Sequence, residues 1–131
     1  MKRARQYDAL RRLGAVQQLH VMEQQVRLLD AQAETAAAKA LAEQCKAASD
    51  AAGAALDHLL GEGLFCPARY AILGSALLAT EEDKSDSIVR LEDRQTNEAG
   101  HQRTWQKRRD QADWIDEQSH ILRKRIARDE D

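Results

Sequence analysis

A single proline divides the sequence into two long segments that otherwise favour helix. Pro67 lies close to the midpoint of the 131-residue chain, directly after the segment Gly61-Glu62-Gly63-Leu64-Phe65-Cys66. Glycine readily adopts the left-handed backbone conformation that ends many helices, so Gly61 and Gly63 predict a helix C-terminus. Proline is favoured in the first turn of a helix, because its φ is preset and its missing amide needs no partner there. The sequence therefore predicts one long helix on each side of a short turn.

The composition is typical of long helices and coiled coils. Charged residues make up 32% of the chain and aromatic residues only 4%, so the large side chains of a compact core are scarce. The alanine, glutamine, glutamate and arginine that take their place favour helix. We expect an all-α fold, an elongated antiparallel two-helix coiled-coil hairpin. Its single domain covers residues 1–131, with helix one over about 5–60, the turn over 61–66 and helix two over about 67–128.

Apolar residues in both segments recur at steps of three and four, which is the spacing of a coiled-coil seam. A four-residue stutter, which shifts the seam by one position after Ala40, locally unwinds a supercoil. In helix one the expected seam residues are Leu19, Met22, Val26, Leu29, Ala33, Ala36 and Ala40 and, after the shift, Leu41, Cys45, Ala48, Ala52, Ala55 and Leu59. In helix two they are Tyr70, Leu73, Leu77, Ile88, Leu91, Trp105, Ala112, Ile115, Leu122 and Ile126.

A hairpin folded about residue 64 places residues side by side when their numbers add to about 128. We therefore expect Met22 to contact Trp105, and Leu41 to contact Ile88. The polar segment 80–87 leaves two interpretations of helix two open. The segment could be a loop followed by a new N-cap. A continuous helix is favoured, because the segment contains neither proline nor glycine.

No residue pattern predicts catalysis, a cofactor or a metal. The four histidines form no pair at i and i+4 and no cluster with cysteine. Cys45 and Cys66 would lie about 25–30 Å apart along helix one, too far for a disulfide. Two free thiols fit a reducing compartment. No run of eighteen apolar residues is present to span a membrane. We expect a non-enzymatic cytoplasmic protein.

Basic side chains gather near both ends of the sequence, which a hairpin brings together. Basic residues near a helix C-terminus complement the helix dipole, but this does not explain the N-terminal set. The candidate contact residues at this end are Arg5, Arg11, Arg12, Arg123, Lys124 and Arg125, whereas Glu81, Glu82, Asp83 and Asp86 make a side of helix two acidic. Trp105 fits the seam. Trp114, nine residues further on, faces the other way and either covers part of the seam or is exposed for a partner.

These features together resemble the type III secretion stalk family, the FliJ/YscO-like proteins. The shared features are the chain size, a basic and glutamine-rich first helix, an alanine- and glutamate-rich middle, and a tryptophan-bearing, arginine-rich second helix. The central break is followed by Phe65-Cys66-Pro67-Ala68-Arg69-Tyr70-Ala71-Ile72-Leu73, which also fits. The resemblance implies an antiparallel coiled coil similar to the central shaft of rotary ATPases.

The resemblance also implies partners and a location. The terminal end of the hairpin would enter the pore of a hexameric export ATPase and regulate it. The part nearer the turn would face the membrane export gate protein, and Tyr70 and Leu77 fall in places that match this contact. Secretion chaperones would also bind. The protein would be cytoplasmic and peripheral to the inner-membrane secretion apparatus, with no membrane insertion.

Two other function classes remain open. One is a nucleic-acid-associated coiled coil that uses the basic end. The net charge of −2 and the lack of aromatic residues among the basic ones count against it. The other is a coiled-coil oligomerisation or scaffold module, because an exposed seam could pair with a second hairpin. The sequence does not decide between a flagellar system and an injectisome, and it does not give the oligomeric state.

Overall fold

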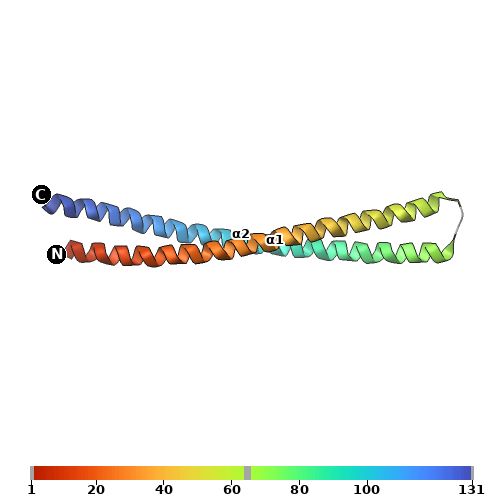
Figure 1. The fold of residues 1–131 in the computed structure, drawn as a ribbon, viewed down its shortest axis with the longest axis horizontal. Helices are drawn as coiled ribbons and strands as arrows, with labels where there is room; N and C mark the ends of the chain where they lie inside the picture. Colours follow the sequence, from red (N-terminus) through yellow and green to blue (C-terminus); the bar gives the residue numbers. More distant parts are fainter. Residues whose placement is uncertain (1, 64–65, 131) are drawn as a thin grey trace. The chain divides into compact units, whose positions relative to one another are not determined.

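The computed structural model describes residues 2–63 and 66–130, which form two helices. Helix α1 runs over Lys2–Gly61 and helix α2 over Pro67–Glu130 (Figure 1). The all-α two-helix hairpin is confirmed. Helix α2 continues through 80–87, so the alternative of a loop at that place is wrong.

Gly63 and Pro67, on either side of the turn, adopt the backbone conformations that the sequence predicts. Gly63 has a φ of 71°, in the left-handed region that glycine adopts without strain. The amide of Glu62 donates to the carbonyl oxygen of Leu59 at 3.4 Å. Helix α2 then begins at Pro67, and the carbonyl oxygen of Cys66 accepts the first bond of the helix from the amide of Tyr70 at 3.0 Å. Two residues of the predicted turn, 64 and 65, lie outside the described residues.

The chain forms two compact units, each with one segment from either helix. Unit 1 consists of Met1–Ala31 and Glu98–Asp131, and unit 2 consists of Gln32–Asn97. Arg3 pairs with Asp129 in unit 1. Residues near the start of α1 therefore lie beside residues near the end of α2, as in an antiparallel pair.

Contacts within the units show which residues of the two helices lie at the same level. In unit 2, Arg94 Nη1 donates to Glu34 Oε2 at 2.8 Å, and these residue numbers add to 128. Ser49 Oγ donates to Glu81 Oε1 at 2.7 Å, and these numbers add to 130. The predicted pairing, with numbers that add to about 128, is therefore correct to within about one helical turn.

The side of α1 that packs against α2 differs from the predicted one. Leu28 is only 7% exposed, whereas its neighbour Leu29 is 56% exposed. Apart from His20 and Gly53, which are half-buried beside the series, the less exposed residues of α1 recur at steps of three and four without a shift, and we call them the inner seam. They are Tyr7, Leu10, Gly14, Gln17, Val21, Gln24, Leu28 and Ala31 in unit 1, and Thr35, Ala38, Ala42, Cys45, Ser49, Ala52, Leu56 and Leu59 in unit 2.

The predicted seam of α1 is therefore wrong over most of its length. Cys45, Ala52 and Leu59 do lie in the inner seam, so the predicted phase holds near the turn. The assumed shift after Ala40 then moved the predicted seam to a different face. The predicted residues that are exposed instead are Leu19, Met22, Val26, Leu29, Ala33, Ala36, Ala40, Leu41, Ala48 and Ala55. Met22 is 61% exposed, so it lies outside the inner seam in which it was expected to contact Trp105.

The predicted seam of α2 agrees better with the structure. Ala112 and Ile115 are 2% and 5% exposed, and most of the other predicted residues are half-buried. Tyr70 and Ile88 are the errors, because each is 43% exposed, and Ser87 beside Ile88 is buried instead. The hydroxyl of Ser87 donates to the carbonyl oxygen of Lys84 at 2.8 Å, so this polar group is satisfied within its own helix. Leu41 and Ile88, which were expected to contact each other in the seam, are 40% and 43% exposed.

Gly14 in the inner seam and Gly53 beside it both face side chains of α2. A Cβ added to Gly14 would lie 3.5 Å from Ile115 Cγ2, and one added to Gly53 would lie 3.9 Å from Leu77 Cδ1. Cys45 and Cys66 are half-buried free thiols, as predicted. Within the described part of the chain, no helix is both long enough and apolar enough to cross a membrane.

Candidate functional site

Basic side chains gather in unit 1 near the ends of both helices. All are exposed, and we call them the basic end: Arg5, Arg11 and Arg12 from α1, and Arg123, Lys124 and Arg125 from α2. An ion pair at this end joins Arg3 to Asp129. Among the described residues, no side chain of the basic end has a carboxylate partner within 4 Å. The fold therefore places these six residues, predicted from the sequence, in the same unit, and Arg11 and Arg123 line one groove there.

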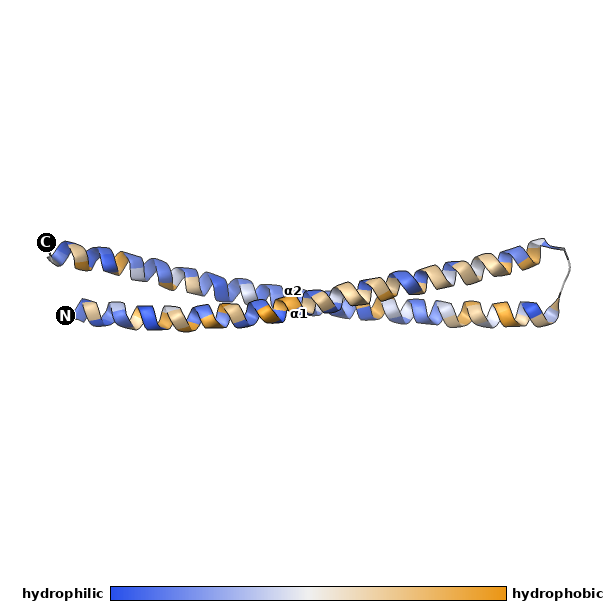
Figure 2. Cartoon of the chain, in the orientation of Figure 1, coloured by the Kyte–Doolittle hydropathy of each residue, from blue (hydrophilic) through white to orange (hydrophobic). Residues whose placement is uncertain are grey.

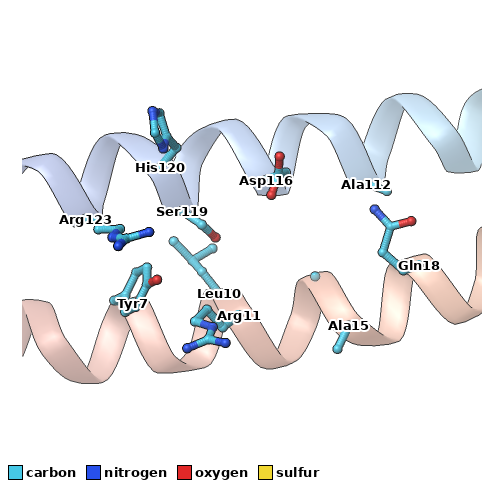
Figure 3. A pocket seen from close by; sticks show the side chains of 11 residues that line it. Tyr7, Leu10, Arg11, Ala15, Gln18, Ala112, Asp116, Ser119, His120 and Arg123 are labelled. Atoms are coloured by element: carbon cyan, nitrogen blue, oxygen red, sulfur yellow. The ribbon is translucent and has the colours of Figure 1, made fainter.

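A groove of about 320 Å³ lies between α1 and α2 within the basic end (Figure 3). Small side chains from both helices line it, including Gly14, Ala15 and Ala112. Figure 3 shows Leu10 pointing from α1 into the space between the helices, toward Ser119 of α2. The groove thus has an apolar part along the inner seam and polar groups around it.

Positive charge lines this groove from both helices. Arg11 of α1 and Arg123 of α2 both line it, together with His120 and the carboxylate of Asp116. The guanidinium carbon of Arg11 lies 5.9 Å from the centre of the Tyr7 ring, an arrangement that favours a cation and orients the side chain. In Figure 3 Arg123 reaches into the space between the helices, whereas Arg11 lies along α1 near Tyr7. An anionic group close to both would be stabilised by both charges. The arrangement suits a carboxylate or another small anion from a partner.

The two tryptophans of α2 have different environments. Trp114 is 59% exposed, in a second groove of about 790 Å³ that Lys107 and Arg108 also line. Trp105 is half-buried, and the guanidinium carbon of Arg109 lies 5.3 Å from the centre of its ring. Of the two interpretations of Trp114, the structure therefore favours an exposed residue that is available for contact.

The two residues predicted for the gate contact belong to unit 2. Tyr70 is 43% exposed. Leu77 is half-buried and packs toward Gly53 of α1, so its side chain contributes to the contact between the two helices. Of the acidic residues predicted nearby, Glu82, Asp83 and Asp86 are exposed, and Glu81 is exposed but accepts the hydrogen bond from Ser49.

Among residues 2–63 and 66–130, there is no group of three or more His, Cys, Asp or Glu side chains that could hold a metal ion. The groove of the basic end itself contains one carboxylate and one imidazole among its lining residues. The groove is therefore a polar surface on which positive charges outnumber negative ones.

The sequence predicted the charges of this site but missed the groove. The prediction named Arg11 and Arg123 for their charge, without the neighbouring Tyr7, Ser119 and His120. A usable signal was present in the heptad pattern. Arg11 follows the seam residue Leu10, and Arg123 follows the seam residue Leu122, so both flank the seam. With the correct phase for α1, this would have placed the two arginines on one side of the helix pair.

Comparison of the chain with protein-family models, with curated proteins and with solved structures gave no match.

Proposed function

We propose that this chain is a non-catalytic coiled-coil adaptor, the central stalk of a type III secretion export apparatus. In this role it links the hexameric export ATPase to the membrane export gate protein and binds secretion chaperones. The observation that carries the proposal is the groove of the basic end, where Arg11 and Arg123 come from two helices to one polar groove. The sequence resemblance to the stalk family supplies the identity of the partners.

The basic end would bind the ATPase through charge. Exposed guanidinium groups attract carboxylates on a partner surface, and arginine can bind a carboxylate through two parallel hydrogen bonds. The apolar part of the groove, including Leu10, would add contact area. In the proposed role, unit 2 would meet the gate protein through Tyr70, on the cytoplasmic side of the inner membrane.

Charge reversal within the groove tests the proposal. The variant carries Arg11→Glu and Arg123→Glu and is mixed with purified export ATPase, and the rate of ATP hydrolysis is measured. We expect the variant to lose the stimulation that the original chain produces, with unchanged helicity by circular dichroism. The stimulation should be lost because glutamate side chains at positions 11 and 123 repel carboxylates on the partner.

A matched control separates this groove from overall charge. Arg69→Glu with Arg90→Glu makes the same change in net charge at two exposed arginines of unit 2, and it should leave the stimulation intact. Equal loss in both variants, or no loss in either, would contradict the proposal. A gel-shift assay with double-stranded DNA tests the nucleic-acid alternative, which predicts binding that the groove variant weakens.

A further inference from the structure

Unit 1 has an apolar surface on α1 that the proposed function does not use. We call it the outer stripe: Leu19, Met22, Val26 and Leu29, which are 66%, 61%, 58% and 56% exposed. They are separated by steps of three, four and three residues, which is the spacing of a coiled-coil seam. In Figure 2 the α1 segment of unit 1 carries repeated hydrophobic bands, whereas its α2 segment is mainly hydrophilic.

The outer stripe lies on the side of α1 turned away from α2. The inner seam takes the two heptad positions that face the partner helix in a coiled coil. Relative to these, the outer stripe takes positions that face water in a two-stranded coil and are usually polar. Leu28 and Leu29 show the contrast between neighbours, at 7% and 56% exposure. Helix α1 of unit 1 therefore has two coiled-coil seams, and α2 covers one of them.

The area of the outer stripe suits an interface with another helix. Four large apolar side chains that are each more than half exposed offer on the order of 400 Å² per copy, in the range of patches that are often functional. A stable complex buries roughly 800 Å² per partner, and polar flanking side chains normally supply the remainder. Such flanking residues are present in Gln18, Glu23 and Gln25.

We propose that the outer stripe binds the outer stripe of a second copy of this chain, with the two α1 helices antiparallel. The order Leu, Met, Val, Leu is nearly the same in both directions. A twofold axis near residue 24 would place Leu19 of one copy against Leu29 of the other, and Met22 against Val26. A twofold interface uses the same patch on both copies, so it requires a self-complementary patch of this kind.

The charges beside the stripe are also compatible with a second copy. Arg27 Nη2 donates to Glu23 Oε1 at 2.8 Å, so the charge of Glu23 on this flank is neutralised within its own helix. The other flank contains Gln18 and Gln25, which are neutral. An antiparallel copy would bring two Glu23–Arg27 pairs together near the axis, with opposite charges within reach of each other. Asp30 is also exposed on the flank of Glu23, and it would lie at the level of Gln18 of the copy, so no like charges are brought together.

Sedimentation of the full chain over a range of concentrations tests the proposal, which does not rest on the proposed function. We expect the original chain to form a dimer as its concentration rises. Leu19→Gln with Val26→Gln should raise the dimer dissociation constant by at least about tenfold, because it places four amides in the apolar interface. Ile72→Gln with Leu78→Gln is the matched control, since these residues are 68% and 74% exposed on α2. A chain that stays monomeric throughout, or equal weakening by both variants, would overturn the proposal.

Cysteine cross-linking tests the orientation without depending on the stability of the glutamine variants. Both chains carry Cys45→Ala and Cys66→Ser, and one adds Met22→Cys while the other adds Val26→Cys. The antiparallel arrangement predicts a disulfide between the two different chains when they are mixed under mild oxidation, and several-fold less between identical chains. Preferential linkage of identical chains would indicate a parallel pair, and linkage no greater than for an Ile72→Cys chain would indicate no pair. Either result would overturn the proposal.

Discussion

At the scale of the residue, polar and small side chains in the inner seam are accommodated by specific local contacts. Ser49 is 2% exposed and donates to Glu81 of the other helix, whereas Ser87 is 3% exposed and donates to a carbonyl of its own helix. Gly14 faces Ile115, and a Cβ there would meet it at an ordinary contact distance of 3.5 Å. The hydroxyls of the two buried serines are therefore satisfied where α1 and α2 pack.

The two buried serines should respond differently to the same substitution. Ser49→Ala removes a hydrogen bond to a carboxylate, and we expect it to lower the free energy of unfolding by about 1–2 kcal/mol. Ser87→Ala removes a bond within one helix and replaces serine by a better helix former, so its effect should lie within about 0.5 kcal/mol of zero. Urea denaturation followed by circular dichroism measures both. Equal effects would show that the Ser49–Glu81 bond does not hold the helices together.

Replacement of glycine by alanine should have opposite effects on stability in helix α2 and in the turn. A Cβ at Gly100 meets no atom within 4 Å, so Gly100→Ala should stabilise α2 by about 1 kcal/mol. Gly63 also has open space, but its φ of 71° disfavours any side chain, and Gly63→Ala should destabilise by about 1 kcal/mol. Thermal denaturation of the two variants should shift in opposite directions. A stabilising Gly63→Ala would contradict the described end of α1.

At the scale of the element, the two tryptophans of α2 report which face meets α1. Trp105→Ala should cost about 2–4 kcal/mol, because a half-buried ring beside the inner seam is removed. Trp114→Ala should change the stability by less than about 0.5 kcal/mol, because Trp114 is 59% exposed. Denaturant titration of both variants gives the comparison. A larger cost for Trp114→Ala would mean that α2 is rotated from the described position.

The sequence was sufficient to predict the helices, the turn and the level at which they pair, because Gly63 and Pro67 act through local backbone preferences. It was also sufficient for most of α2, where one apolar stripe dominates. It failed for α1, where Leu19, Met22, Val26 and Leu29 form a more apolar stripe than the seam that contains Gln17 and Gln24. Periodicity shows that a stripe exists, but it does not show which partner covers it.

A simpler rule would have placed the inner seam correctly. Starting from Leu59 beside the turn, uninterrupted heptad steps reach Ala52, Cys45, Ala38, Ala31 and so on to Leu10. The assumed stutter after Ala40 followed the larger side chains instead. The groove of the basic end could not be predicted for the same reason, because its lining depends on the phase of α1.

At the scale of the whole molecule, the proposed stalk role depends on charge at the basic end. Exposed charges are screened over about 8 Å at physiological ionic strength, so stimulation of the export ATPase should decline as salt is raised. The apparent dissociation constant for the ATPase, measured at several salt concentrations, tests this. The Arg11→Glu and Arg123→Glu variant should show a weaker dependence on salt. A dissociation constant that does not change with salt would indicate that apolar contacts, and not the basic end, bind the partner.

The central feature of the molecule is that α1 has one apolar face covered by α2 and, in unit 1, another that is exposed. Substitution of two adjacent leucines in separate variants tests this most directly. At concentrations low enough to keep the chain monomeric, Leu28→Ala should lower the free energy of unfolding by about 2–4 kcal/mol, because Leu28 is 7% exposed. Leu29→Ala should lower it by less than about 1 kcal/mol, because Leu29 is 56% exposed. A larger loss for Leu29→Ala than for Leu28→Ala would contradict the described face of α1, and with it the outer stripe and the groove of the basic end.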